Sequence, residues 1–233
     1  MNTLIVGTIL VFLLAAPKIW ARYIFFKHNR GRQDLPETGG ELVNHQLARL
    51  ELVEVQLSHA GERSHYDPVT KSVCLTDGTM NNRSLTALVR AAFEVGHAIQ
   101  DNRQQRLSHY RQGLISLAHH GERLGSGALL LAPLVAILIP SLGGWLLFCA
   151  VVSMLSGAMV HLVILPIEWQ AGFHIALPML KQIAPLGPQD QHAVRQILAA
   201  CAFSHFAYAL ANLLDGRHWL SVLGLKQRKQ KDC

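Results

Sequence analysis

Charged side chains are scarce in this sequence. Only 15% of its 233 residues are Asp, Glu, Lys or Arg, and half are hydrophobic, whereas soluble domains carry about 25% charged residues. The shortage is local, because the run from Leu124 to Pro166 contains no Asp, Glu, Lys or Arg and a single imidazole, His161. This pattern favours a membrane protein with a polar portion over a uniformly soluble protein.

Cysteine is also sparse. The four cysteines form no Cys-x-x-Cys pair, and Cys149 and Cys201 lie in apolar stretches. These features argue against a disulfide framework and against a thiolate zinc site. We therefore expect Cys149 and Cys201 to act as small apolar side chains.

The net charge is +6, and the basic residues gather beside apolar runs. One basic cluster occupies 18–32 and the other 226–231. Basic residues that flank membrane spans mark the cytoplasmic side, so we expect both clusters in the cytoplasm and no nucleic-acid partner. The charge follows the first apolar run instead of preceding it, which predicts an uncleaved anchor over 1–27 and not a signal peptide.

A mixed polar portion follows over 28–123. Within it, Asp67-Pro68 begins a turn and "SVCLT" alternates, which predicts a short β-hairpin over 64–78. A motif helix is predicted over 85–106 from an apolar stripe with a spacing of four, three and four residues. We expect Gly96 inside this helix to make room for a neighbouring element, and the residues around it to face a cleft.

The apolar run predicts a transmembrane hairpin over 124–167. About 20 apolar residues cross a bilayer, so we expect two spans, 124–140 and 145–165, that turn at Gly143-Gly144. The remainder, 168–233, is predicted to contain a helix that begins at Glu168, an apolar-rich helix over 193–214 and the basic tail. A transporter or channel is disfavoured because the spans have almost no polar residues to line a path.

The stretch "AAFEVGHAIQ", residues 91–100, is one residue short of a His-Glu-x-x-His motif. Two histidines at i and i+4 on a helix hold one Zn²⁺, and the glutamate acts as general base on the bound water. Here Glu94 and His97 are present, but position 93 is Phe93, whose ring has no lone pair. Alone, Glu94 and His97 would be ordinary polar residues of a helix.

Three further segments strengthen the motif. "HYDP" at 65–68, the apolar hairpin and "LPIEWQAG" at 165–172 occur in the order and spacing of the YugP-type neutral zinc metallopeptidases, which the chain resembles. The resemblance implies a zinc ion, His97 and Glu168 as ligands and Glu94 as general base. It also implies that Phe93 replaces a histidine and that Gln170 stands where asparagine is expected. Glu168 has separate support, because a charged group beside a membrane span is costly and usually functional.

Another histidine would have to supply the missing ligand if zinc is to have three. The candidates are His161, seven residues before Glu168, His174 beyond it and His65 in the hairpin. Each is more often a structural residue, and two protein ligands are too few for a normal catalytic zinc. A recent natural change and a deliberate substitution both explain Phe93.

The sequence therefore predicts a mainly α, multi-span protein of the bacterial inner (cytoplasmic) membrane. We expect its small α+β zincin-like portion and its site to face the cytoplasm. By resemblance it hydrolyses a peptide or membrane-protein substrate with zinc-activated water, and Phe93 should abolish or impair this activity. The alternative is a non-catalytic membrane adaptor that binds a peptide or a partner membrane protein. For both the peptidase and the adaptor, the expected partners also include the lipid bilayer and further copies of the chain or a partner membrane protein.

Overall fold

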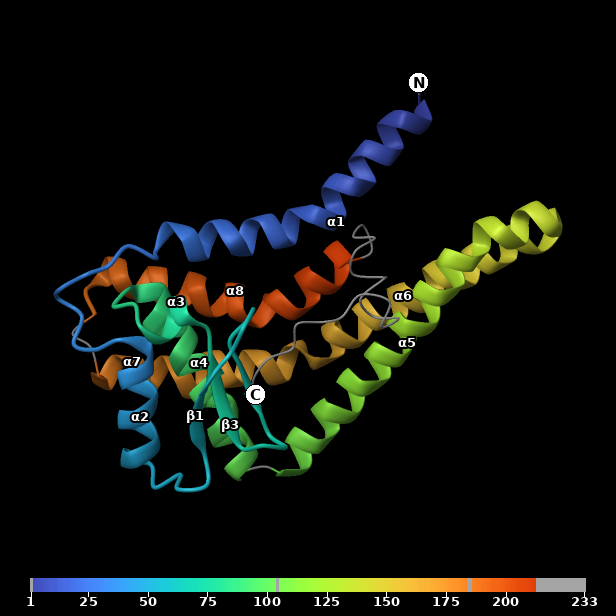
Figure 1. The fold of residues 1–233 in the computed structure, drawn as a ribbon. Helices are drawn as coiled ribbons and strands as arrows, with labels where there is room; N and C mark the ends of the chain where they lie inside the picture. The colour runs from blue at the N-terminus through green and yellow to red at the C-terminus, as the bar shows by residue number, and fades with distance from the viewer. Residues whose placement is uncertain (1, 104, 184–185, 213–233) are drawn as a thin grey trace. The chain divides into compact units, whose positions relative to one another are not determined.

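The computed structural model describes residues 2–103, 105–183 and 186–212, and they are mainly helical (Figure 1). They fall into two compact units, each built from separate segments. Unit 1 contains 2–18, 111–165 and 204–212, and unit 2 contains the other described residues. The domain boundaries expected from the sequence, and the zincin-like character of the polar portion, stay predictions.

Twelve elements follow one another along the described chain. They are α1 (Asn2–Lys27), α2 (Gly39–Arg49), β1 (Gln56–His59), β2 (His65–Asp67), β3 (Ser72–Leu75), α3 (Asp77–Met80), α4 (Leu85–Arg103), α5 (Gln105–Leu138), α6 (Pro140–Trp169), the π-helix η1 (Gln170–Ala176), α7 (Leu177–Ile183) and α8 (Pro188–Asn212).

Helix α4 is the central element of unit 2. Every residue from Leu85 to Asp101 is buried except Arg90, because α2, α3, β2, β3, η1 and α7 all contact this helix. A helix enclosed on all sides belongs to a protein core. The predicted helix over 85–106 is confirmed without a break at Gly96, but it ends at Arg103, and α5 begins at Gln105.

A small three-stranded sheet packs beside α4 in unit 2. Strands β2 and β3 pair antiparallel, with His65 opposite Cys74, so the predicted hairpin is confirmed. The sequence did not reveal β1, which pairs parallel to β3. Strand β3 is therefore the central strand in the order β1-β3-β2.

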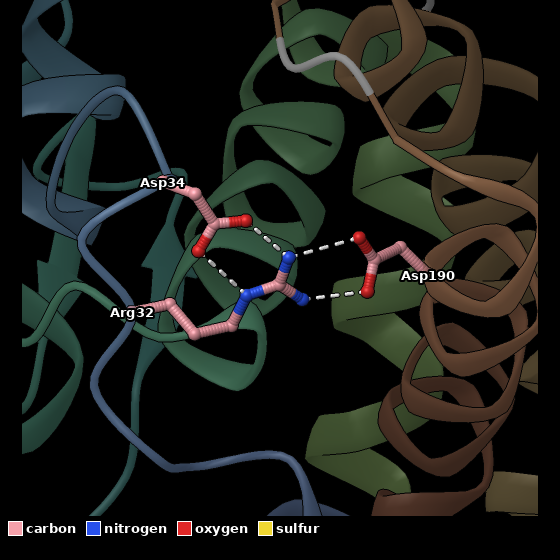
Figure 2. A network of polar contacts seen from close by, with 3 residues as sticks. All are labelled: Arg32, Asp34 and Asp190. Atoms are coloured by element: carbon pink, nitrogen blue, oxygen red, sulfur yellow. Dashed lines mark hydrogen bonds and ion pairs between the residues drawn. The ribbon is translucent and has the colours of Figure 1, made fainter.

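Arg32 joins the segment after α1 to the start of α8 (Figure 2). Its Nε donates to Asp34 Oδ1 at 3.0 Å, and its Nη1 donates to Asp190 Oδ1 at 2.6 Å. Its Nη2 donates to the second oxygen of each carboxylate. The hydrogen bond from Arg32 holds the pKa of Asp34 below its ordinary value, and the two carboxylates raise the pKa of Arg32.

The end of α1 and the residue after it also hold the N-terminal end of α4. The Thr86 hydroxyl donates to the carbonyl oxygen of Phe25 at 2.9 Å, and the Thr86 backbone N–H donates to the carbonyl oxygen of His28. Arg90 lies over the Phe25 ring, 5.1 Å from its centroid. The end of α1 is therefore fixed to the helix that carries the motif.

Within unit 1, α5 and α6 form the predicted apolar hairpin, but the predicted turn at Gly143-Gly144 is wrong. The chain turns at Ile139, and Pro140 begins α6, a position where proline is favoured because the first helical N–H has no intrahelical partner. Gly143 instead allows close packing, since a Cβ there would lie 2.4 Å from Ala136 Cβ.

Three described helical segments are long and apolar enough to cross a membrane: His109–Leu138, Pro140–Ile183 and Pro188–Ala211. The third differs from the other two in burial. Of its most apolar stretch of 18 residues, 50% is buried in the protein, whereas the corresponding share is 22% in His109–Leu138 and 19% in Pro140–Ile183. The predicted helix over 193–214 is thus part of α8, with 213–214 outside the described residues. α1 is not among these three segments, and the N-terminal anchor over 1–27 stays a prediction.

Candidate functional site

Helix α4 carries Phe93, Glu94 and His97 into the interior of unit 2. Their exposed fractions are only 2%, 9% and 4%. The expectation that they face an open cleft is therefore wrong, because the neighbouring elements of unit 2 close over α4. Glu94 and His97 are three residues apart, so they are neighbours on one side of the helix.

Glu168 reaches this site from the last turn of α6. It is 2% exposed, and its Oε2 lies 3.0 Å from Nε2 of His97, although the two residues are 71 apart in sequence. The predicted approach of Glu168 to His97 is confirmed. A carboxylate and an imidazole thus meet inside the protein, where an unpaired charge would be costly.

Two glycines allow the backbones of α4 and η1 to approach closely. A Cβ on Gly96 would lie 2.8 Å from the carbonyl oxygen of Ala171, a contact that a real side chain could not make. A Cβ on Gly172 would lie 3.3 Å from Cε2 of Phe93. The expected role of Gly96 is confirmed, and η1 follows Glu168 directly, so this packing also places the carboxylate.

Gln100 connects the two sides of the site. Its Oε1 lies 3.0 Å from Nδ1 of His97. Its Nε2 donates to the carbonyl of Ile167 and to Oε1 of Gln170, both at 3.1 Å. Gln170, for which the sequence suggested no clear role, therefore helps to hold Gln100.

The Phe93 ring lies beside His97 in an edge-to-face arrangement. The ring centroids are 4.9 Å apart and the planes are nearly perpendicular, at 89°. Positions 93 and 97 are one helical turn apart, which is the spacing of the two histidines in His-Glu-x-x-His. The Phe93 ring, which has no metal-binding atom, therefore packs directly against the His97 imidazole.

A second polar network lies one turn further along α4. Asp101 is buried and accepts hydrogen bonds from the Tyr66 hydroxyl at 2.9 Å and from Lys71 Nζ at 2.5 Å. Burial, and then the bond to Asp101, raise the pKa of Tyr66 above its ordinary value, so the phenol stays a donor. Sequence reasoning missed this network, and the tyrosine of "HYDP" was its only local signal.

The other candidate histidines do not join His97. His65 in β2 and His174 in η1 are exposed, and the ring of His65 donates to the carbonyl of Arg63. His161 lies in unit 1, where its ring stacks with that of His205 at 6.1 Å. Within the described parts of the chain, no three His, Cys, Asp or Glu side chains gather as a metal group.

The donor atoms can be compared with the needs of zinc. Bonds of about 2.1 Å at a tetrahedral angle place two ligand atoms about 3.4 Å apart, close to the 3.0 Å between His97 Nε2 and Glu168 Oε2. The bond from the other ring nitrogen to Gln100 is also typical of a metal-binding histidine. However, catalytic zinc takes three protein ligands, and among the described residues no third His, Cys, Asp or Glu joins His97 and Glu168 in a metal group. The donor set of this chain therefore does not fit a catalytic zinc ion.

Comparisons with known proteins indicate the family of the chain. The model of the family described as "Putative neutral zinc metallopeptidase" matches residues 3–224. The "Putative membrane protease YugP" of Bacillus subtilis (strain 168) is 26% identical over 151 residues, which cover 65% of this chain and 64% of that relative. The match thus spans somewhat less than two thirds of the relative's length, and no solved structure matches the chain. With almost its whole length matched by the family model, the chain belongs to the putative neutral zinc metallopeptidase family.

Proposed function

We propose that this protein has the scaffold of a membrane-bound zinc metallopeptidase, and that Phe93 has removed or strongly weakened its peptidase activity. The observation that carries the proposal is the 3.0 Å contact between His97 Nε2 and Glu168 Oε2, with the Phe93 ring beside it. His97 and Glu168, the two proposed zinc ligands, face each other, and Phe93, at the position of the proposed third ligand, cannot bind metal.

The roles follow from the positions on α4 and α6. His97 and Glu168 are the two remaining zinc ligands, and Glu94 is the general base of the intact family site. Glu94 supports this assignment because it is buried on the same helix, three residues before His97. We propose a peptide or a segment of a membrane protein as the substrate of the intact site, which would face the cytoplasm.

Restoring histidine at position 93 tests the proposal. Phe93→His supplies an imidazole one helical turn before His97, on the same side of the helix. We expect this variant to hydrolyse casein or a peptide library in the presence of zinc, while the parent chain does so slowly or not at all. In Phe93→His with Glu94→Gln, hydrolysis should fall by about 10²–10⁴, the usual contribution of a general base.

Phe93→Leu is the matched control, because it changes the size of the side chain without adding a donor. It should be as inactive as the parent. If Phe93→His gains no hydrolysis although it folds and binds zinc, the peptidase-scaffold proposal is wrong. The non-catalytic adaptor, which binds a peptide or a partner membrane protein, would then replace it.

A further inference from the structure

The end of α1, residues 19–27, belongs to unit 2 and turns one side outward. We propose that this side, together with Arg30, binds the headgroups of anionic phospholipids and so holds unit 2 at the membrane surface. The proposal uses no residue of the candidate site, so it stands apart from the proposed peptidase function.

The inner side of this segment packs into unit 2. Ala21 and Ile24 are only 2% and 5% exposed, and Arg90 of α4 lies 5.1 Å from the centroid of the Phe25 ring. With 3.6 residues per turn, positions 21, 24 and 25 fall on one side of a helix. The opposite side of the segment therefore faces away from the core of unit 2.

This outer side is apolar, although it is exposed. It carries a patch of four large side chains, here called the aromatic face, whose exposed fractions are 59% for Ile19, 42% for Trp20, 59% for Tyr23 and 82% for Phe26. Their spacing places them within about a third of the helix circumference. The outward side of a surface helix normally carries polar residues, so an aromatic face at this place indicates a binding surface.

Basic side chains accompany the aromatic face. Arg22 is adjacent to Phe26 on the helix, and Lys27 is adjacent to Tyr23, because each pair is four residues apart. Arg30 follows shortly after the helix ends. All three basic side chains belong to exposed residues, and none of them has an acidic partner among the described residues. The outer side of the segment thus combines aromatic rings with positive charges that are available for binding.

Charge and residue type together favour a lipid surface as the occupant. Residues 1–33 contain no Asp or Glu, so the negative charge must come from the binding partner. Anionic headgroups attract basic clusters beside a membrane anchor, and Trp and Tyr side chains gather at the depth of the headgroups. The segment directly follows the apolar run of the predicted anchor. A second copy of the chain fits poorly, because two such faces would bring like charges together.

The aromatic face is firmly connected to the start of α4. The Thr86 hydroxyl donates to the carbonyl oxygen of Phe25 at 2.9 Å, and the Ser84 hydroxyl donates to Oδ1 of Asn29 at 3.0 Å. These bonds join the segment to the first turn of the helix that carries the motif. Headgroups bound at α1 therefore fix the height of α4 relative to the bilayer surface.

Fluorescence quenching of Trp20 measures the depth of the aromatic face in the full chain. Trp20 is one of four tryptophans, and the other three are replaced by Phe. The protein is reconstituted in nanodiscs of phosphatidylcholine mixed with phosphatidylglycerol. We expect strong quenching by lipids with a nitroxide at the headgroup, and weaker quenching by lipids with a nitroxide at the end of the acyl chain or by acrylamide in the water.

Each other pattern of quenching would overturn the proposal. Strongest quenching by acrylamide would place the aromatic face in water. Strongest quenching from the end of the acyl chain would make the segment part of a membrane span. Little quenching by all three quenchers would mean that protein, such as a second copy of the chain, covers the face.

Energy transfer from Trp20 to a dansyl-labelled lipid tests the role of charge. At equal amounts of label, transfer to phosphatidylglycerol should exceed transfer to phosphatidylcholine. In Arg22→Gln/Lys27→Gln/Arg30→Gln this preference should fall at least about fivefold, since each basic residue near an anionic surface contributes about that factor. A parent chain without any preference for phosphatidylglycerol would overturn the proposal, and this result needs no charge variant to fold.

Arg49→Gln/Arg103→Gln/Lys181→Gln is the matched control. It removes the same charge from three other exposed residues of unit 2, and it should keep the preference for phosphatidylglycerol. An equal loss of preference in the two triple variants would also overturn the proposal, because the effect would then follow from net charge and not from the aromatic face and its basic neighbours.

Discussion

The contact between Gly96 and the Ala171 carbonyl sets the spacing between α4 and η1, and Gly96→Ala tests it. The added Cβ would lie 2.8 Å from that oxygen, so one backbone must move. Overpacking of this kind costs about 1–3 kcal/mol, whereas alanine in place of glycine stabilises a helix by about 1 kcal/mol. The variant should therefore be about 0–2 kcal/mol less stable than the parent.

Gly113→Ala in α5 is the matched control, because a Cβ there meets nothing within 4 Å. It should gain the helix propensity alone, about 1 kcal/mol. The two variants should differ by about 1–3 kcal/mol, which corresponds to about 2–12 °C in Tm for a chain of this size. Thermal unfolding in the same detergent measures this difference. A Gly96→Ala protein as stable as Gly113→Ala would refute the close approach of α4 and η1.

Three more predictions concern other parts of the chain. Tyr66→Phe should cost about 1.5–3 kcal/mol because the buried Asp101 carboxylate loses a donor, while Tyr23→Phe, at a ring 59% exposed, should cost almost nothing. Equal losses of Tm would contradict the network. Arg32 lowers the pKa of Asp34, so this pair stabilises the fold above the ordinary pKa of aspartate and loses its effect as the pH falls through the lowered value. The fall in Tm below about pH 4 should therefore be smaller in Arg32→Gln than in the parent, and an equal fall would count against the pair. Reporter fusions at residues 60 and 233 should both be cytoplasmic, and an external signal from either would reject the predicted orientation.

The orientation prediction has a structural consequence for α8. With an external N-terminus and a spanning α1, a cytoplasmic C-terminus requires an odd number of spans. If α1, α5 and α6 are the three spans, this orientation predicts that α8 does not cross. Its burial supports this, because its apolar window is more than twice as buried as those of the other two candidates.

Local sequence patterns revealed the elements whose stabilising contacts are local. The apolar stripe of α4 and the alternation in β3 predicted the motif helix and the hairpin. Strand β1 has only the four residues "QLSH", and its parallel partner comes later in the chain, so no local turn announces it. The pair Gly143-Gly144 resembled a turn in sequence, yet Gly143 serves helix packing and Pro140 marks the turn.

The site was predictable only as far as the resemblance extended. Glu168 near His97 followed from the order of the family's segments, and no periodicity could have given it. The role of Gln100 was not foreseen, although the residue stands in the motif, because its partners are 67 and 70 residues away in sequence. The π-helix η1 was not foreseen either, because no local pattern in Gln170–Ala176 indicates it.

Zinc stoichiometry tests the central claim most directly. Both purified proteins are dialysed against the same buffered zinc. The parent chain should then contain well below one zinc per chain, and Phe93→His close to one. Phe93→His combined with His97→Ala or with Glu168→Ala should lose the metal again, because each double variant has only two donors. A parent chain that holds one zinc as tightly as Phe93→His, or double variants that keep it, would contradict the assignment of His97 and Glu168 as the ligands and of position 93 as the missing one.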